Sequence, residues 1–561
     1  MPRWLFASLH GYRIGWLPRD FVAGLMLAAI AIPGQLATAR LAGMPPETGL
    51  YAFAAGSLAF AAFGANRFMS VAADSTIAPI FAGGVATLAA AGTQHYAELV
   101  TLLALMVGII LVGVGLLRAG WLATLLSIPV TTGFLAGISI HIIVGELPTL
   151  LGISEEQGHL LLRLFHILGR LGETNPYTLA LGAGVLAITL CMAKISSKIP
   201  GAFVGIVLAG IAVALFQLQT HGVSLLNPLS VELPGLELPS VPGTREFAHL
   251  VPLALIVAMV CIMQTSAVAS TFPSEKGKPD DVSRNFAGVG AGSIVASLIG
   301  SFSVDASPPS TAIVVESGGQ SQIASMTAVA LMIGLFLLAA GLMAYVPHAA
   351  LSGILVYIAL KIFRLREMIR IYRQSKWEIL LVAASGGLVV ALPIDTGMLL
   401  AIVLSFVYSL YAVARPYCAE LARVPGSTVW WPPGQDEERE HVPGVLVFAT
   451  AAPITFTNAQ YISDRITTAL AAAPAPVRLL VIEASGMIDI DYTGSQILQQ
   501  TIATLRSRSI EVAIARLSDT RAQEEASRTG LITALGPERV FKSVEEAVRG
   551  LGPGTKLGGR R

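Results

Sequence analysis

Charged residues are scarce in this chain of 561 residues: Asp, Glu, Lys and Arg make up only 13% of it, whereas 54% of the residues are hydrophobic. A soluble globular protein carries about 25% charged residues. The composition therefore excludes an ordinary soluble protein and indicates that lipid surrounds most of the chain. The formal net charge of +1 gives no indication of a nucleic-acid partner, and we expect none.

Cysteine is also scarce, with only Cys191, Cys261 and Cys418 in the chain. Their spacing matches neither a metal site nor a disulfide framework. The sequence contains no Gly-rich phosphate-binding loop and no arrangement of residues typical of a nucleophilic enzyme. We therefore expect no enzymatic activity, no metal and no cofactor.

Long apolar runs dominate the first three-quarters of the chain. Runs near 20 residues are long enough for a helix to cross roughly 30 Å of hydrocarbon, and examples are 21–39, 99–117, 251–269 and 326–344. These runs, counted together with the positions of Lys and Arg, give about fourteen spans. The fold class that they predict is a polytopic α-helical membrane protein.

Basic residues indicate the orientation of these spans. The densest basic stretch, KIFRLREMIRIYRQSK at residues 361–376, lies on the same side as the chain termini when fourteen spans are counted. Lys and Arg accumulate in cytoplasmic loops. We therefore expect a multi-pass protein of a bacterial-type inner membrane, with its termini and its C-terminal domain in the cytoplasm.

The pattern of residues changes from about Val442 onward. GVLVFATAAPITF, VRLLVIEASGMIDID and EVAIARL are typical of strands, and helical periodicity lies between them. Strands that alternate with helices predict a small α/β domain. The chain thus divides into a membrane part over 1–425, a polar Pro-rich linker over 426–441, the α/β domain over 442–552 and a disordered tail over 553–561.

Two interrupted segments, one in each half of the membrane part, share a pattern. SVAADSTIAP begins at Ser70 and SVDASPPSTA begins at Ser303. Each has Ser-Val, then an acid with small residues, hydroxyls and proline. Corresponding interrupted segments in two halves are the best sequence indication of a transporter's binding site.

Proline determines how the second segment folds. Pro308 and Pro309 have no N–H, so they fit the first turn of a helix but not its middle, and Ser307 is the natural N-cap. We expect an extended chain over 301–305 and a half-helix over 308–316.

The first segment is expected to fold in the same way. Residues 68–72 are extended, and a half-helix begins near Asp74 or Ser75. Two half-helices that start near the midplane would direct their positive ends and free amides at one cavity. Such a cavity is an anion site that needs no basic residue.

The N-terminal spans resemble those of SulP transporters, the sulfate-permease-type anion carriers. The resemblance lies in LPRDFVAGLMLAAIAIPGQLATARLAGMPPETGLYA, where the signature residues are Pro33, Ala42-Gly43, Pro45-Pro46 and Gly49-Leu50-Tyr51. The tail is similar to the STAS domain that closes such carriers, in PITFTNAQYISDRI, VIEASGMIDIDYTG and VFKSVEEAV. Its D-x-TG element is Asp491, Thr493 and Gly494.

The resemblance implies a seven-plus-seven inverted repeat, UraA-like, with a core domain and a gate domain. The repeats would cover about 18–222 and 245–416. It also implies a substrate site between the facing starts of spans three and ten, with side chains from spans one and eight. Elevator-like movement of the core against the gate and a homodimer are further implications.

Nine residues are therefore candidates for substrate binding. They come from span one, span eight and the two interrupted segments: Gln35, Thr38, Asp74, Ser75, Thr76, Gln264, Asp305, Ala306 and Ser307. Three places depart from the family pattern. Gln264 stands where relatives often carry a carboxylate, Thr38 where they often carry Tyr, and Asp305 near a position where they often carry Arg.

Asp305 and Asp74 are the candidate coupling residues. A carboxyl beside an anion can bind a proton or a sodium ion together with that anion, and acids inside a membrane are functional by default. The alternative remains that each acid only accepts hydrogen bonds from backbone amides at the start of its half-helix.

Three further polar residues have undecided roles. Thr493 holds the position near which bacterial relatives of the STAS domain are phosphorylated, so it is a candidate regulatory residue, although a structural turn is the alternative. The roles of Glu146 and Glu316 stay open.

The sequence thus predicts a secondary active transporter of small anions such as sulfate, bicarbonate or dicarboxylates, coupled to protons or sodium ions. The lipid bilayer and a second copy of the chain are its other expected partners. Two alternatives are a nucleobase-type carrier of the same architecture and a non-transporting anion sensor that signals through the STAS domain.

Overall fold

The computed structural model describes residues 5–9, 11–121, 127–154, 160–195, 200–226, 235–236, 238–240, 242–275, 280–339, 345–432 and 440–552. The chain forms two compact units, Met1–Phe406 and Val407–Arg561. The boundary between them falls inside helix α16, Ile394–Ala414. The tail expected at 553–561 lies outside the described residues.

The first unit repeats one order of elements twice. The first repeat comprises α1 Leu17–Leu41, α2 Pro46–Phe63, β1 Val71–Ala72, α3 Ala78–Ala86, α4 Gln94–Leu116, α5 Ile128–Leu151, α6 Leu160–Gly169, α7 Pro176–Ile195 and α8 Gly201–Phe216. The second comprises α9 Thr244–Thr271, α10 Val282–Leu298, β2 Asp305–Ala306, α11 Pro308–Glu316, α12 Ile323–Ala339, α13 His348–Ile362, α14 Leu365–Gln374, α15 Glu378–Ala391 and α16 Ile394–Ala414. The matching order confirms the seven-plus-seven arrangement, with α6 and α14 as an additional short helix in each repeat.

Many of these helices suit a bilayer by length and composition. Seven helices among the described residues are long and apolar enough to cross it, and three further apolar helices are shorter, at Gly201–Phe216, Ile323–Leu337 and Glu378–Ala391. The half-helices α3 and α11 have only nine residues each. At about 1.5 Å per residue, neither can cross alone.

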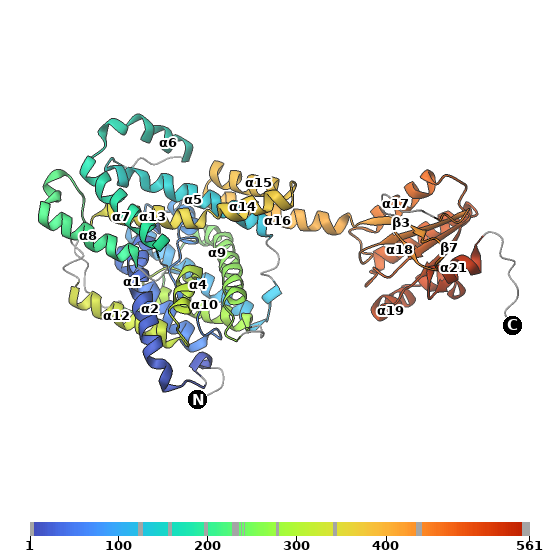
Figure 1. Ribbon diagram of the computed structural model, residues 1–561, viewed down its shortest axis with the longest axis horizontal. Coiled ribbons are helices and arrows are strands. Elements are labelled where there is room, and N and C mark those ends of the chain that lie inside the picture. The colour runs from blue at the N-terminus through green and yellow to red at the C-terminus, as the bar shows by residue number, and fades with distance from the viewer. Residues whose placement is uncertain are drawn as a thin grey trace. The chain divides into compact units, whose positions relative to one another are not determined.

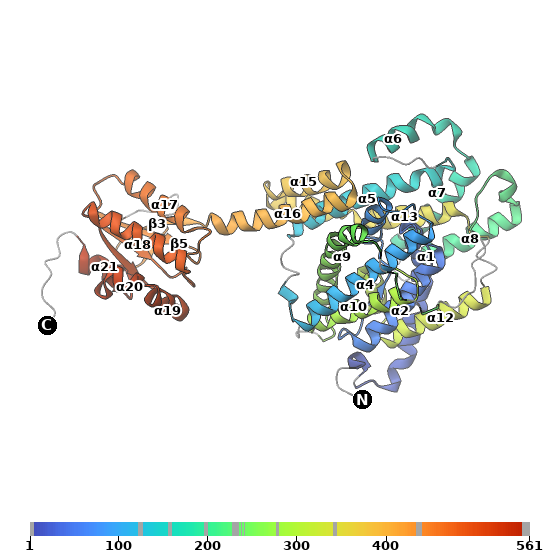
Figure 2. The same ribbon diagram turned by 180° about the vertical axis from the view of Figure 1, so that it is seen from behind.

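The helices of the first unit pack as a core and a gate. In the core, α10 packs on α4 and α2, and α1 packs on α12 and α2. In the gate, α5 packs on α15 and α13, and α7 packs on α13 and α8. Figure 1 shows α1, α2, α4 and α10 gathered together, and Figure 2 shows them from behind. Because α1 also contacts α13 and α8, it is a core helix at the border with the gate.

Glycine and proline of the first-span signature bring α1 and α2 together. Gly43 has a φ of +69° in the turn between these helices, and Pro46 begins α2, where no N–H is needed. A Cβ atom on Gly49 would lie 2.1 Å from the carbonyl oxygen of Gln35. Gly49 therefore lets α2 lie directly against α1 beside Gln35.

The second unit is an α/β domain with a six-stranded sheet in the order β4-β3-β5-β6-β7-β8. Its parallel strands are β5 Val445–Thr450, β6 Leu479–Glu483, β7 Glu511–Ala515 and β8 Val540–Phe541, and Val445 and Glu511 both pair with Leu479. β3 Cys418–Arg423 runs antiparallel to β5 and to β4 Trp430–Trp431. The helices are α17 Ala459–Ala472, α18 Tyr492–Ser507, α19 Thr520–Arg528, α20 Leu531–Leu535 and α21 Val544–Leu551.

Both faces of this sheet are buried. Leu480 and Ile482 of β6 belong to a core with α17, α18, α19 and α20, whereas Leu479 and Val481 belong to a second core with α21. A parallel strand covered on both faces reads as one apolar run, as LLVIE does.

The sheet begins earlier than the α/β domain expected from the sequence. β3 lies within the segment assigned to the membrane part, and β4 lies within 426–441, the expected linker. The sequence CAELAR of β3 has little intrinsic preference for a strand. It becomes one because it pairs with the otherwise open edge of β5.

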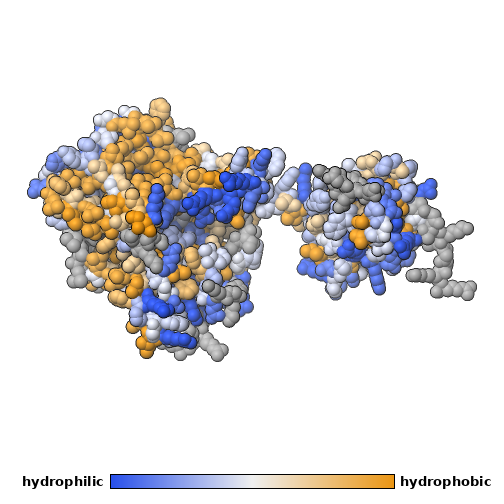
Figure 3. All heavy atoms as spheres, in the orientation of Figure 1, coloured by the Kyte–Doolittle hydropathy of each residue, from blue (hydrophilic) through white to orange (hydrophobic). Residues whose placement is uncertain are grey.

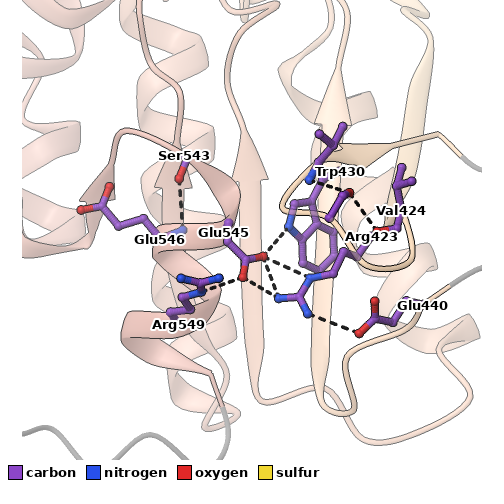
Figure 4. A network of polar contacts seen from close by, with 10 residues as sticks. Arg423, Val424, Trp430, Glu440, Ser543, Glu545, Glu546 and Arg549 are labelled. Carbon is purple, nitrogen blue, oxygen red and sulfur yellow. Dashed lines mark hydrogen bonds and ion pairs between the residues drawn. The ribbon is translucent and has the colours of Figure 1, made fainter.

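Glu545 of α21 ties the start of this unit to its last helix (Figure 4). Its carboxylate accepts hydrogen bonds from Arg423 Nη2 at 2.7 Å, Trp430 Nε1 at 3.2 Å and Arg549 Nε at 2.8 Å. Burial raises the pKa of Glu545, but the hydrogen bonds from these three side chains outweigh burial and hold the pKa below its usual range.

We predict that Glu545→Gln loosens β3 and β4 from α21, because Arg423 then loses its buried charged partner and, among the described residues, keeps only Glu440, at 3.3 Å. Removing one partner of a buried ion pair costs about 3–5 kcal/mol. Hydrogen exchange of the full chain at pH 7 should become faster at 418–431 and 544–551. Glu524→Gln, at an exposed position of α19, is the control and should change nothing.

The same network predicts a pH dependence. A carboxylate whose pKa is depressed in the folded state stabilises that state above its unfolded pKa, which is about 4.3 for Glu. The wild-type protection should therefore fall as the pH is lowered below about 4.3, and this fall should be smaller in Glu545→Gln. If wild type and Glu545→Gln exchanged hydrogen at equal rates both at pH 7 and below pH ~4.3, the network would not hold the unit together.

Candidate functional site

The two interrupted segments meet each other inside the first unit. β1 and β2 pair antiparallel, with Val71 opposite Ala306 and Ala72 opposite Asp305. The pairing continues at Ser307, whose N–H donates to the carbonyl oxygen of Ser70 at 2.9 Å. The half-helices α3 and α11 follow directly, so both start at this junction.

The second half-helix has the predicted bounds, and the first starts later than predicted. α11 begins at Pro308 and ends at Glu316, with the side chain of Ser307 accepting from Ser310 N at 3.5 Å, which confirms the N-cap. α3 begins at Ala78 instead of Asp74 or Ser75. The Asp74 carboxylate accepts from Thr76 N at 2.7 Å, and this local bond favours a turn over helix between them.

The strand pairing gathers polar side chains on one face of the junction. Successive residues of a strand point to opposite faces, and directly paired residues share a face. The register, continued by the bond from Ser307 N to Ser70 O, therefore places the polar residues Ser70, Asp305 and Ser307 on one face together with Ala72. The alternation Ser-x-Asp-x-Ser at residues 303–307 could have pointed to Ser303, and the Ser-Val pattern shared by the two segments could have pointed to Ser70.

Burial divides the candidate residues into two groups. Asp74, Ser75, Gln264 and Ser307 keep 8–9% of their surface exposed, whereas Asp305 is fully buried. The partly exposed residues can touch a ligand that enters from solvent. Asp305 and its neighbour Ala306 lie behind them.

The two half-helices do not offer equal numbers of free amides. At the start of α3, the N–H groups of Ser75 and Ile77 make no hydrogen bond with any described residue. At the start of α11, Pro308 and Pro309 have no N–H, and Ser310 N is capped by Ser307. The amide donors expected from both halves thus come mainly from the first, while α11 contributes its dipole and hydroxyls.

Gln35 holds the backbone of the first segment. Its Nε2 donates to Ala73 O at 3.1 Å, and its Oε1 accepts from Ala73 N at 3.0 Å. Both polar ends of this buried side chain are therefore used by protein. Thr38, one turn further along α1, is also buried. The structure places Gln35 as a support for the site, next to Asp74.

Gln264 of α9 connects the two halves of the site. Its Nε2 donates to Thr76 Oγ1 at 2.6 Å, and the hydroxyl of Thr76 in turn donates to the Asp74 carboxylate. This relay orients the amide of Gln264 and the acid of Asp74 around the start of α3.

Asp305 lacks a full set of partners. Its Oδ1 accepts from Ala306 N at 2.7 Å, whereas its Oδ2 is buried with no hydrogen-bond partner among the described residues. The hydroxyls of Ser70, Ser303 and Thr265 are also buried and find no hydrogen-bond partner in the described part of the chain. Thr265 belongs to α9, which packs on β2. Thr265 was not among the predicted site residues, although it follows Gln264 directly.

A second polar cluster joins the core to the gate at the end of α1. Arg40 donates to His348 O at 3.1 Å and to Thr149 Oγ1 at 2.6 Å. Ser352 Oγ donates to Glu146 Oε2 at 2.7 Å and lies 3.3 Å from Arg40 Nη1. Glu146 therefore accepts a hydrogen bond at the border between core and gate and does not belong to the strand junction. Glu316 is exposed at the end of α11.

Thr493 lies in the first turn of α18 and is exposed. The N-cap of this helix is Asp491, which accepts from Gly494 N at 2.6 Å and from Phe456 N at 2.8 Å. The D-x-TG element therefore anchors the start of α18 and leaves the hydroxyl of Thr493 accessible.

The family model described as "Sulfate permease family" matches residues 17–385, and the model described as "STAS domain" matches residues 438–547. The chain belongs to the sulfate permease family. It is 31% identical to a "Probable sulfate transporter" of Mycobacterium tuberculosis (strain CDC 1551 / Oshkosh), over 96% of each chain. It is 24% identical to "Probable sulfate transporter 3.4" of Arabidopsis thaliana, over 98% of this chain and 87% of the plant protein.

Solved structures support the fold of this family member. The murine Solute Carrier 26 family member A9 anion transporter in its inward-facing state is similar with a TM-score of 0.87 at 18% identity, over 97% of this chain and 93% of that one. The transmembrane domain of a cyanobacterial bicarbonate transporter is similar with a TM-score of 0.61 at 20% identity, over 71% and 98%. The chain is thus an integral membrane transporter of the sulfate permease family that ends in a STAS domain.

We predict that Gln35→Leu destabilises this transporter even without substrate, because two buried backbone groups of Ala73 lose their partners. Their loss costs about 2–4 kcal/mol. Thermal unfolding in detergent should occur at a lower temperature, and hydrogen exchange over 71–76 should be faster. Gln264→Leu, which removes a single bond to Thr76, is the matched control with a smaller effect. Wild-type stability of Gln35→Leu would contradict the supporting role of Gln35.

Proposed function

We propose that this chain is a secondary active transporter that carries small oxyanions, sulfate foremost, across a membrane. The observation that carries the proposal is the antiparallel pairing of β1 with β2, which sets the starts of α3 and α11 at one junction within the membrane unit. The relatives named as sulfate transporters favour sulfate, and the bicarbonate transporter of similar fold keeps bicarbonate as an alternative substrate.

An oxyanion suits the chemistry of this junction. The N–H groups of Ser75 and Ile77, the hydroxyl of Ser310, which accepts from Ser307, and the second N–H of the Gln264 amide are hydrogen-bond donors, and the helix dipoles add partial positive charge. The residues of the junction include no Lys or Arg. The anion would therefore be held by neutral donors rather than by a bidentate Arg clamp.

We assign the coupling of anion transport to Asp305, with Asp74 as the second candidate. An ionised carboxylate that is buried without a compensating charge is costly, and one oxygen of Asp305 has no hydrogen-bond partner among the residues that the structure describes. A bound proton would remove this charge. A bound sodium ion would offset it, with the hydroxyls of Thr265 and Ser303 as further oxygen donors. Either cation would also favour the anion, and the coupling is reciprocal.

We predict that Asp305→Asn abolishes the stimulation of anion uptake by a cation gradient. Proteoliposomes are given labelled sulfate, bicarbonate, chloride or fumarate with an imposed proton or sodium gradient. Wild-type uptake of one oxyanion should rise about tenfold with one gradient, which corresponds to ~1.4 kcal/mol of coupling. Asp305→Asn should retain exchange of the anion down its own gradient but lose the rise. Glu316→Gln, on the exposed end of the same half-helix, should behave as wild type.

Other outcomes of this experiment decide between the alternatives. Binding of an anion without flux would favour a sensor that signals through the STAS domain. A further set of proteoliposomes receives labelled uracil, and uptake of this nucleobase in place of the anions would favour the carrier of the same architecture. An Asp305→Asn variant with unchanged dependence on both gradients would exclude Asp305 as the coupling residue and transfer the test to Asp74→Asn.

We further propose that the core moves against the gate like an elevator. The Arg40 cluster supports this proposal, because Arg40 lies on core helix α1 while Ser352 and Glu146 lie on gate helices α13 and α5. Its bonds span the border and would break during such a movement.

We predict that a cross-link across this border stops transport. In a cysteine-free background, Arg40→Cys with Ser352→Cys joined by a bismaleimide should reduce sulfate uptake at least about tenfold below the unlinked protein. Glu146→Cys with Ser352→Cys is the matched control, because both residues lie on the gate and the same linker should leave uptake at its unlinked rate. Equal inhibition after cross-linking of the two cysteine pairs would contradict movement between core and gate.

The orientation, assembly and regulation of the protein remain part of the proposal. The basic stretch at 361–376 supports a cytoplasmic C-terminal unit in a bacterial inner membrane. The resemblance implies a homodimer. The exposed hydroxyl of Thr493 at a helix start is suited to phosphorylation, because a helix N-terminus favours the added negative charge.

A further inference from the structure

The densest basic stretch of the chain falls on α14 and its two ends. Residues 361–378 contain six basic residues and two acidic ones, Glu367 and Glu378. The basic residues are Lys361, Arg364, Arg366, Arg370, Arg373 and Lys376. None of them belongs to the strand junction or to the cluster around Arg40, so transport as described above leaves this charge unexplained.

The position of α14 places it at the edge of the bilayer. Arg364 takes a left-handed conformation, with a φ of 43°, and separates α14 from α13, which ends at Ile362. α15 begins at Glu378. The ten residues of α14 extend only about 15 Å, half of a bilayer's hydrocarbon core. α14 therefore connects the ends of two membrane helices on one face of the membrane, without crossing it.

One face of α14 is apolar and exposed. Leu365, Ile369 and Tyr372 are spaced by four and three residues, so they lie on the same side of the helix, and they are 57%, 43% and 59% exposed. Trp377, just after the helix, is 80% exposed. Ile371 is buried and marks the opposite side, where α14 packs on α5 and α15. Exposed apolar side chains at this depth fit the boundary between headgroups and acyl chains.

Arginine lines the border of this apolar face. Arg366, Arg370 and Arg373 are exposed and follow one another at helical spacing. Arg370 pairs with Glu367 at 3.0 Å, whereas Arg366 and Arg373 form no ion pair with any described residue. Figure 3 shows a hydrophilic patch where Figure 1 labels α14, beside broad hydrophobic surface of the first unit. Long side chains at such a border extend their charged ends into the headgroup layer.

Helix α6 of the first repeat corresponds to α14, so the two helices can be compared for their apolar face and for their basic charge. In α6, Leu162, Phe165 and Leu168 are 57%, 78% and 57% exposed, so its apolar face is similar. Its arginines are fewer, and Arg170 is paired with Glu173 at 2.7 Å. An exposed apolar face is thus common to both repeats, whereas the excess of positive charge is confined to α14.

We propose that α14 lies in the headgroup layer and binds anionic phospholipids of the leaflet on the side of the chain termini. The apolar face enters the upper acyl region, and the arginines contact the phosphates. Each basic residue near an anionic surface adds about 1 kcal/mol, or roughly a fivefold preference. Because α14 packs on α5 and α15, this contact attaches the gate to the membrane surface while the core is free to move. The proposal rests on the assigned fold and not on the identity of the transported anion.

The test uses the full chain in vesicles and the fluorescence of Trp377, taken as the difference between wild type and Trp377→Phe. Phosphatidylcholine vesicles receive increasing fractions of brominated phosphatidylglycerol or of brominated phosphatidylcholine. Bromine quenches nearby tryptophan. Half-maximal quenching of Trp377 should need about fivefold to tenfold less of the anionic lipid.

Two variants separate charge from fold. Arg366→Gln/Arg370→Gln/Arg373→Gln should lose the preference for the anionic lipid, whereas Arg366→Lys/Arg370→Lys/Arg373→Lys should keep it. Sulfate uptake is not needed for this measurement, so the result stands apart from the test of transport. Equal quenching of the wild-type protein by the two lipids, or an unchanged preference in the Gln variant, would overturn the proposal. Displacement of the effect by inorganic phosphate at millimolar concentration would overturn it also, because the site would then bind the free ion.

Discussion

The pairing of β1 with β2 is the contact on which the membrane unit depends. Inside a bilayer, the N–H and C=O groups of an extended chain need protein partners wherever they do not line a water-filled cavity. Each interrupted segment contains extended residues that its own helix cannot satisfy. The two segments satisfy each other, and Ser307 N donates to Ser70 O where the ladder ends. Because this solution needs one segment from each repeat, the halves must meet at the centre of the unit.

The same junction sets the electrostatics of the site. Strand alternation places Asp305 on one face with Ser70 and Ser307, Asp74 follows β1 in the turn before α3, and two helix starts supply partial positive charge there. No basic side chain balances the two acids within the junction. Under the proposal above, a small cation bound at these acids would favour the bound anion, as a coupled carrier requires. Gln35 and Gly49 contribute by holding the first segment at its place.

Polar networks away from the junction occupy the borders of the molecule's parts. The Arg40 cluster lies where the core meets the gate, and Glu545 lies where the first strands of the C-terminal unit meet its last helix. The arginines of α14 lie where the gate meets the membrane surface. In each of these three cases, charge is placed where two parts must be joined.

The sequence by itself determined the broad design of this protein. Apolar length predicted the membrane helices, proline predicted the start of α11 at Pro308, and the repeated Ser-Val pattern located the junction, because these features act through local geometry and burial. Only the tertiary structure decided that Gln35 supports Ala73, that the free amides come mainly from α3, and that Asp305 lies fully buried beside Thr265. It also decided that CAELAR forms a strand. These outcomes depend on which distant groups satisfy each other's hydrogen bonds, and no local pattern in the chain contains that information.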